Sequence, residues 1–527
     1  MGLRGHASRV LDRRPPLASH LRRGLGCLRD LARADRGDAR RHYDLRPRLA
    51  DPSRPGPRRR RCGADPCAGG AAIVSGSGWS RRRILAAGTL GAAGAVIPGC
   101  VRSVSTPPPL PPPPDSTGSA AADAIVASTA LPSIPAASYP IHGLRGDGRS
   151  DDTRAIQDAI DTCHGRGGGR VVVPAGEFLV GALRLRSRVG VHLDSAATLK
   201  FSDDPERYPL VQTRYEGLEC VNHSPMIQAS GETDVAITGS GRLDASATAA
   251  WNRGRNRAGV LEPLVARGVP PAHRIVAGRL RTAMVETVGC ARVLIRGVTL
   301  AGSPFWQIHP TLCADVTVEG VTTTDSGPNS DGCDPESCER VVIRSCTFSC
   351  GDDNVALKSG RDEDGRRLGV PCRNVVIVGC QGEGRFGFIT CGSEQSGGIE
   401  NVFACANRSF GRGVGHALWV KSNSRRGGYT RNVNMDGFRG RVLDAVAAVT
   451  MHYDGQSGAF PPAFDGIHLR NLAVESAGAV LDLDGLEDSR IRNFTLSRSA
   501  FADVGAADRV RNADVARRDV TVNGVAL

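Results

Sequence analysis

The sequence predicts an all-β protein wound as a parallel β-helix, with a short helix capping its N-terminal end. From residue 234 onward one template recurs, in which two polar residues precede an alternation of apolar and other residues. Copies such as Ala291-RVLIRGVTLAG, Ala314-DVTVEGVTTTD and Glu339-RVVIRSCTFSC start 23–25 residues apart. A unit this short cannot bury its apolar face alone, so neighbouring units must stack. A β-propeller, the alternative, needs about 40 residues and four strands per blade.

The capping helix is predicted just before the first β-rich segments. Four apolar residues in 154–164 share one helical face, and a run of glycines from 165 to 169 ends the pattern. The residues of that face are Ile156, Ala159, Ile160 and Cys163. Asp152 precedes the helix and is the expected N-cap.

The N-terminal quarter has a different composition from the rest. Residues 1–79 are expected to be a disordered or mis-annotated extension, because they are rich in Arg, Pro and Gly. Residues 80–100 resemble a twin-arginine export signal, with Cys100 a candidate for lipidation. The alternative is a chance arginine cluster. A Pro-rich linker, 101–137, then leads to a catalytic domain over 138–527. We expect export to the periplasm, the cell envelope or the medium, with the membrane contacted only through a lipid on Cys100.

The net charge does not indicate a nucleic-acid partner. The whole chain carries +13, but residues 1–83 hold 21 Arg and 7 acidic residues. The remaining residues hold 46 basic and 47 acidic side chains, which is a net charge of −1. A basic binding face on the folded body is therefore not expected.

Cysteines recur in step with the template. Twelve of the 16 follow Cys100, and four of them precede the same template position in successive units: Cys290, Cys313, Cys338 and Cys372. This register predicts a column of small buried thiols rather than a disulfide framework or a zinc site.

Two acidic clusters in residues 328–360 carry the candidate chemistry. Asp331 lies in Asn329-Ser330-Asp331-Gly332, and Asp352 and Asp353 follow about one coil later. Neighbouring rungs are about 4.8 Å apart, so the clusters should meet. A diagonal between rungs gives carboxyl separations of roughly 6.5–9.5 Å, the range for inverting hydrolysis of a glycosidic bond. Crowded like charges should also keep one acid protonated. A lone Asp-Gly would merely indicate a turn.

These motifs resemble glycoside hydrolase family 28, the polygalacturonase-like enzymes, and in particular its bacterial members. The resemblance runs from about Gly143 to about Gly455 and rests on Gly146-DGRSDDTRAIQDAID, Ser303-PFWQIHP, Pro328-NSDG, Gly351-DD and Val420-KS. It implies a right-handed parallel β-helix and inverting hydrolysis of pectic poly- or oligosaccharides, mostly α-linked galacturonan. It also implies that no metal or other cofactor is needed, and we expect a monomer.

The resemblance also assigns roles by position. It implies that Asp352 is the general acid and that Asp331 and Asp353 activate water. The other positions implied to bind substrate are Asn329, Lys421, which would pair with a sugar carboxylate, and Tyr453.

Two positions depart from the family pattern. Phe386 stands where the family has an active-site His, and Trp419 where it has an Arg. His416 lies nearby, but a surface role is the simpler interpretation. Because the aromatic rings can stack on a sugar face, we expect both to bind substrate. Our hypothesis is a preference for a decorated or less charged pectic glycoside.

Two other functions fit parts of the pattern. A β-helix lyase would use the acids to hold Ca²⁺, and a non-catalytic β-helix would only bind carbohydrate. Endo or exo action is left open, although insertions at 246–275 and 361–371 are candidates for blocking one end of a cleft.

Overall fold

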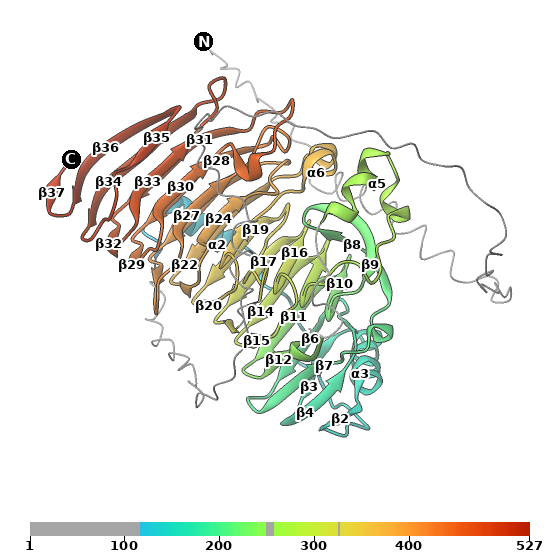
Figure 1. The fold of residues 1–527 in the computed structure, drawn as a ribbon. Helices are drawn as coiled ribbons and strands as arrows, with labels where there is room; N and C mark the ends of the chain where they lie inside the picture. The colour runs from blue at the N-terminus through green and yellow to red at the C-terminus, as the bar shows by residue number, and fades with distance from the viewer. Residues whose placement is uncertain (1–115, 249–257, 325–326) are drawn as a thin grey trace, which may run out of the picture. The chain divides into compact units, whose positions relative to one another are not determined.

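A computed structural model describes residues 116–248, 258–324 and 327–527. The described chain is a right-handed parallel β-helix whose rungs follow one another in sequence order (Figure 1). Each rung contributes strands to three parallel rows. Apolar side chains of all three rows point inward and form one continuous core. The fold class predicted from the template is confirmed.

The first row consists of the strands that begin each template copy: β3 (Gly169–Val173), β6 (Val189–Leu193), β11 (Thr233–Gly239), β14 (Ala291–Arg296), β17 (Ala314–Glu319), β19 (Glu339–Arg344), β22 (Cys372–Val378), β25 (Ile399–Cys405), β28 (Tyr429–Asp436), β31 (Ala463–Arg470), β34 (Ile491–Phe501) and β36 (Ala513–Val522). The second row follows after a tight turn: β4 (Gly176–Val180), β7 (Ala197–Phe201), β12 (Arg242–Asp244), β15 (Thr299–Ala301), β18 (Thr322–Thr324), β20 (Thr347–Ser349), β23 (Gln381–Glu383), β26 (Arg408–Ser409), β29 (Arg439–Arg441) and β32 (Ala473–Ser476).

The third row carries the candidate site. Its strands are β5 (Leu183–Arg184), β10 (Ile227–Ser230), β13 (Val285–Val288), β16 (Ile308–Thr311), β21 (Val355–Leu357), β24 (Gly387–Gly392), β27 (His416–Lys421), β30 (Ala445–Thr450), β33 (Ala479–Asp484) and β35 (Arg509–Arg511). Between β16 and β21 the chain is bridged at Cys333 to both neighbours, so the row continues through residues 331–336.

The second polar position of the template has a conformational role. In successive rungs it adopts a left-handed backbone, with φ between 53° and 70°, at Asp234, Arg292, Asp315, Arg340, Asn374, Asn401, Asn432, Gly466 and Asn493. Asn, Asp and Gly tolerate this conformation, whereas Arg does so less readily. The two arginines in the column bind the aspartate of the preceding rung: Arg292 to Asp234 and Arg340 to Asp315, each with a contact of 2.6 Å. The column therefore explains why this position is always polar or glycine.

The two ends of the coil differ, and within the described residues only the N-terminal end is covered by a helix. Helix α3 (Thr153–Gly165) caps the N-terminal end and buries the four predicted apolar residues. Asp152 occupies the N-cap position but does not cap the helix; its carboxylate accepts from the amides of Arg145 (2.8 Å) and Gly146 (3.1 Å). Strand β1 (Ser138–Tyr139) pairs with β3 and β2 (Asp147–Asp151) with β4, and β37 (Val525–Ala526) folds back antiparallel on β36.

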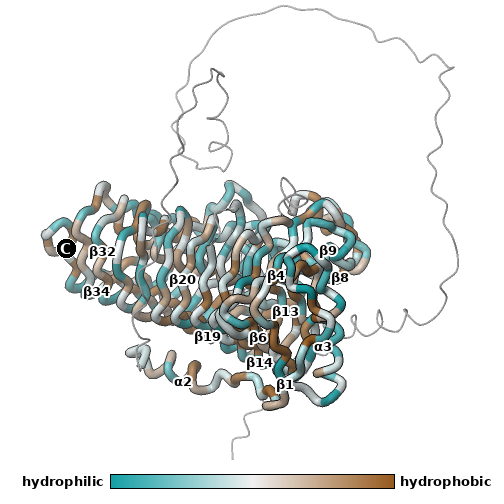
Figure 2. Tube along the Cα trace, turned by 90° about the horizontal axis from the view of Figure 1, so that it is seen from below, coloured by the Kyte–Doolittle hydropathy of each residue, from teal (hydrophilic) through white to brown (hydrophobic). Residues whose placement is uncertain are grey.

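The packed chain begins before the expected domain start near Ser138. Helix α2 (Ala120–Ser128) lies along the outside of the first row, where Ala122 packs with Val376 and Phe403 (Figure 2). Further on, the amide of Ser133 donates to Asp234 at 2.8 Å. The expected extension 1–79, the export signal 80–100 and residues 101–115 of the expected Pro-rich linker lie outside the described residues. Within the described residues no helix is long and apolar enough to span a membrane.

The stacked-thiol prediction is confirmed. All twelve cysteines of the described chain are free and buried. Cys290 and Cys313 lie on adjacent rungs, with the Cys290 amide 3.4 Å from the Cys313 sulfur. Cys338 continues the column, donating to the carbonyl of Pro310 at 3.2 Å. These thiols fill the interior beside a turn that larger side chains would not fit.

Candidate active site

The two acidic clusters meet in the third row. Cys333 pairs with Val355 in parallel register, and the Gly332 amide donates to the Asp353 carbonyl at 3.0 Å. Asp331 therefore lies directly across from Asp353, with Asp352 adjacent. One carboxylate oxygen from each of the three lies within 4.8 Å of the others. The 4.8 Å limit applies to one oxygen of each carboxylate and not to the centres of the carboxyl groups. The separation of roughly 6.5–9.5 Å between carboxyl groups that inverting hydrolysis requires therefore stays a prediction.

Asp353 is held by a backbone amide and a lysine. The Gly387 amide donates to Oδ1 at 2.7 Å, and Lys421 Nζ lies 2.9 Å from Oδ2. Burial opposes the charge on Lys421, but attraction to Asp353, Tyr453 and Asp352 outweighs it and raises the lysine pKa. Lys421, predicted to face a sugar carboxylate, is thus bound to one of the site's own aspartates.

Asp352 is oriented by Asn329. The Asn329 amide donates to Asp352 Oδ2 at 3.3 Å, and the Asp353 backbone amide donates to Oδ1 at 3.1 Å. Asn329 has a left-handed backbone, with φ of 58°, and its side-chain oxygen accepts from Arg281 at 2.7 Å. Arg281 is not marked by any motif in the sequence, because it follows the insertion at 246–275 and lies outside the repeated template.

Asp331 lies in a buried charged cluster that the sequence only partly indicates. Lys358 Nζ is 3.9 Å from Asp331, 3.4 Å from Asp334 and 3.3 Å from Glu394. Burial, together with Asp334 and Asp352, raises the pKa of Asp331 well above its usual value. Burial also raises the pKa of Asp334 to about 7. Burial alone would raise the pKa of Glu394, but attraction to Lys358 and Arg426 lowers it.

The cluster therefore holds a proton near neutral pH. Asp334 is completely buried, and neither carboxylate oxygen has a hydrogen-bond partner within the described residues. A buried carboxylate in this position is most stable when protonated. Asp334 follows Asp331 by three residues, and that spacing on one rung is the signal that would have found it.

An aromatic group borders the carboxylates on the C-terminal side. The rings of Phe386 and Trp419 are 6.4 Å apart and nearly parallel, at 13°. Tyr453 meets Trp419 edge-on at 6.2 Å, and Lys421 Nζ lies 3.7 Å from the centre of the Trp419 ring. His416 is 5.1 Å from the same ring. The structure thus brings the predicted residues Phe386, Trp419 and Tyr453 together beside Asp353.

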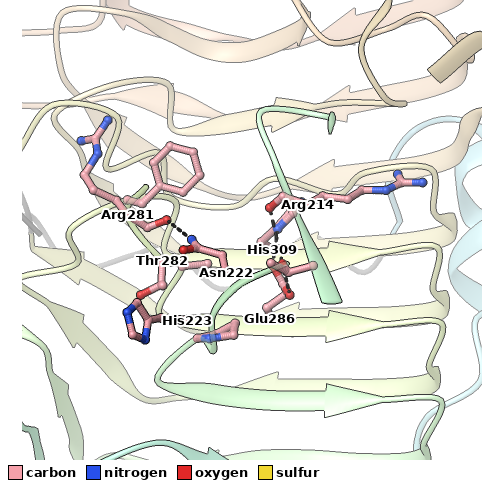
Figure 3. A pocket seen from close by; sticks show the side chains of 11 residues that line it. Arg214, Asn222, His223, Arg281, Thr282, Glu286 and His309 are labelled. Carbon is pink, nitrogen blue, oxygen red and sulfur yellow. Dashed lines mark hydrogen bonds and ion pairs between the residues drawn. The ribbon is translucent and has the colours of Figure 1, made fainter. Parts of the chain in front are cut away.

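A β-hairpin covers the third row on the N-terminal side. It consists of β8 (Leu210–Tyr215) and β9 (Leu218–His223), which pair antiparallel. Figure 3 shows Arg214 and Asn222 of the hairpin close to His309 and Glu286 of the row. Nothing in the sequence template indicates this hairpin, because its strands belong to no rung.

Buried charges fix the hairpin to the row. Arg214 Nη1 is 2.9 Å from Glu336, and the Thr213 hydroxyl donates to Glu286 at 2.7 Å. His309 bridges the two glutamates, at 3.1 Å from Glu286 and 2.9 Å from Glu336. Although burial opposes its charge, the two glutamates raise the pKa of His309 to about 9. Glu336 lies on the same rung as Asp331, so the hairpin reaches the rung of the candidate site.

Stacked aromatic rings seal the same contact. Tyr215 of the hairpin stacks on Phe305 at 4.6 Å, and Phe305 stacks on Trp306 at 4.7 Å. Lys358 Nζ lies 4.3 Å from the Trp306 ring centre. The hairpin core thus ends against the lysine of the carboxylate cluster.

The two long insertions fold against each other and against the hairpin. They contain α5 (Glu262–Ala266) and α6 (Asp362–Leu368). Arg361 forms ion pairs with Glu216 of the hairpin, at 3.0 Å, and with Glu262. The hairpin, α5 and α6 are called the wall below.

The fold and the site define a class: a parallel β-helix with three clustered, buried aspartates, as expected for a β-helix glycoside hydrolase. The profile of Glycosyl hydrolases family 28 matches residues 163–404. The chain is 34% identical to the exopolygalacturonase of Thermotoga maritima, with a TM-score of 0.73, covering 77% of this chain and 96% of that one. It is 28% identical to a probable polygalacturonase of Vitis vinifera, covering 67% and 71% of the two chains.

The chain belongs to glycosyl hydrolase family 28. It is accordingly a glycosidase of the polygalacturonase type that acts on pectic substrates. The Yersinia enterocolitica family 28 exopolygalacturonase has the same fold, with 21% identity and a TM-score of 0.58 over 75% of this chain and 80% of that one. The lyase and the purely carbohydrate-binding alternatives are set aside by this membership.

Proposed function

We propose that the protein is an inverting, exo-acting hydrolase that releases galacturonate units from the end of a pectic chain. The observation that carries this proposal is the position of three buried aspartates directly beside the wall. The exopolygalacturonase of Thermotoga maritima, 34% identical, supports the same activity.

The roles of the three acids follow from their surroundings. We assign the role of general acid to Asp352, whose carboxylate is oriented by the side-chain amide of Asn329. We assign the role of principal base to Asp353, whose carboxylate is held by Lys421 at 2.9 Å and by the Gly387 amide at 2.7 Å. Asp331, which lies across from Asp353 and 3.9 Å from Lys358, helps to position the attacking water. Acid and base must act on opposite faces of the sugar in an inverting reaction.

The wall determines the direction of binding. Because the hairpin lies on the rungs that precede Asp331, a long chain cannot continue along the third row in that direction. The non-reducing end would bind against the wall, and the rest of the polymer would extend over β24, β27 and β30. This orientation places the leaving group on the C-terminal side of Asp352.

The first experiment is a product profile on pectic oligosaccharides. An exo enzyme releases only small units from one end at all stages, whereas early internal fragments would contradict the proposed action. Asp352→Asn should lower kcat by about 10²- to 10⁴-fold with unchanged circular dichroism. If both proteins bind pectin equally and neither releases sugar, hydrolysis at this site is refuted.

We also infer export through residues 80–100, lipidation at Cys100, a catalytic domain over 138–527 and a monomeric state. Cell fractionation checks the first two: replacing Arg81 and Arg82 by Lys should retain the protein in the cytoplasm, and Cys100→Ser should release it from the envelope. Sedimentation of the purified protein checks the monomeric state.

A further inference from the structure

The aromatic group on the C-terminal side suggests which sugar the leaving-group position accepts. This inference rests on the proposed exo hydrolysis, in which the polymer extends over β24, β27 and β30. Phe386 lies directly before Gly387, whose amide holds Asp353, and Trp419 lies one rung further in β27. The two half-exposed rings therefore border the position where the departing sugar must lie.

The cation expected to bind a uronate there is already bound. Lys421 is 4% exposed, ion-paired with Asp353 at 2.9 Å and covered by the Trp419 ring at 3.7 Å. A sugar carboxylate would have to compete with Asp353 for it. His416 does not add a charge, because burial lowers its pKa and its Nδ1 donates to the Ala445 carbonyl at 2.7 Å.

The next rungs also lack the charge pattern of a polyuronate site. In the outward-facing register Trp419 is followed by Ala448 and then Asp482. Lys421 is followed by Thr450 and then Asp484. The cations of the following rung, in β35, are paired with these acids: Arg509 with Asp482 and Arg511 with Asp484, each at 2.6 Å. A chain leaving the site thus meets neutral side chains and then acidic ones.

We propose that Phe386, Trp419 and Tyr453 form a leaving-group subsite for a sugar ring that carries no free carboxylate. The ring would stack on Trp419 with its apolar face, as sugars do on aromatic side chains. Two substrates share this chemistry: a neutral sugar, and galacturonate whose carboxyl is methyl-esterified. Two arginines border this subsite. Arg426, 5.6 Å from the Tyr453 ring centre, is buried and paired with Glu394 at 3.6 Å, whereas Arg385 is exposed, precedes Phe386 and could bind a carboxylate.

Three trisaccharides distinguish these cases with the full chain. Each begins with free galacturonate at the non-reducing end, and the other two units are free galacturonate, methyl-esterified galacturonate or neutral galactose. We expect kcat/KM for one or both of the uncharged forms to exceed that for the free acid by about tenfold. The trisaccharide with the highest kcat/KM shows whether the uncharged ring is a neutral sugar or methyl-esterified galacturonate.

Variants then assign the preference to the rings. Trp419→Ala should lower kcat/KM for the preferred trisaccharide by about fivefold, Trp419→Phe should restore most of it, and Trp419→Arg should shift the preference to the free acid. Phe460→Ala, which removes a 47% exposed ring packed on Arg366, is the matched control and should have no effect. Thermal unfolding of each variant confirms that it is folded.

Two results would overturn the inference. In the first, the wild type cleaves the trisaccharide of free galacturonate fastest, and the Arg385→Ala variant no longer prefers it. The other is an equal effect of Trp419→Ala on all three trisaccharides. If the wild type cleaves none of them and does not differ from Asp352→Asn, the proposed hydrolysis itself fails.

Discussion

Replacing Arg214 by Met should detach the hairpin from the catalytic row. Arg214 and Glu336 are 5% and 0% exposed at their side chains, and their closest contact is 2.9 Å. Removing one member of a buried ion pair typically costs 3–5 kcal/mol, because the other charge is left uncompensated. Glu336 still keeps His309 at 2.9 Å, so we expect a loss of about 3 kcal/mol, at the low end of that range.

The matched control lies in β35, at the C-terminal end of the third row. Arg509 binds Asp482 through two hydrogen bonds of 2.6 and 2.7 Å, but these side chains are 48% and 35% exposed. Arg509→Met should therefore cost less than about 1 kcal/mol. Urea unfolding at pH 7, followed by circular dichroism, measures both values.

A product profile adds a functional readout to the unfolding data. If the hairpin blocks the row, Arg214→Met should release internal fragments that the wild type and Arg509→Met do not produce. Adding Glu336→Gln to Arg214→Met should recover part of the lost stability, since no buried charge is then left unpaired. Equal losses for the two arginine variants would refute the argument from burial.

Three further predictions concern stability. The pKa of His309 is about 9 in the folded protein, above its ordinary 6.5. Its contribution to the free energy of unfolding is therefore complete below pH 6.5 and is lost as the pH rises through 9. Urea titrations should show a fall of about 3 kcal/mol in this free energy, and His309→Gln should abolish the fall. The pKa of Asp334 is about 7 in the folded protein rather than 3.8, so the wild type should lose stability as the pH rises from 4 to 7. Asp334→Asn should flatten this dependence of unfolding free energy on pH. An unchanged dependence would contradict the assignment of the proton to Asp334. Gly239 has φ of 108°, and an added Cβ would lie 1.9 Å from the Leu193 carbonyl oxygen, so Gly239→Ala should lower the free energy of unfolding by about 3 kcal/mol. Gly320 has φ of 60° with open space around it, so Gly320→Ala should lower it by only about 1 kcal/mol. Thermal unfolding measures both values.

The rungs and the meeting of the acids could be predicted because both depend on local periodicity. A constant spacing between template copies sets the register, and the register places Asp331 across from Asp353 without knowledge of any distant contact. The same reasoning predicts the thiol column and the apolar face of α3. It fails at Asp152, because two amides of the preceding turn compete for its carboxylate with the helix terminus.

The wall and the partner of Lys421 could not be predicted from local patterns. Arg361 pairs with Glu262, 99 residues away, and with Glu216, 145 residues away. Such pairs leave no periodic trace, and the length of an insertion does not say where it folds. Lys421 illustrates the same limit, since a lysine motif indicates a positive charge but not the carboxylate with which the lysine forms an ion pair.

The twelve buried thiols place a condition on the order in which this protein matures. Burial raises the pKa of Cys372 to about 12, so this thiol is unreactive once the coil is wound. In the unwound chain the same twelve sulfurs are accessible to one another and to oxidants. Any disulfide formed then would join thiols that are free in the finished coil. Winding must therefore be complete before the chain meets an oxidising compartment.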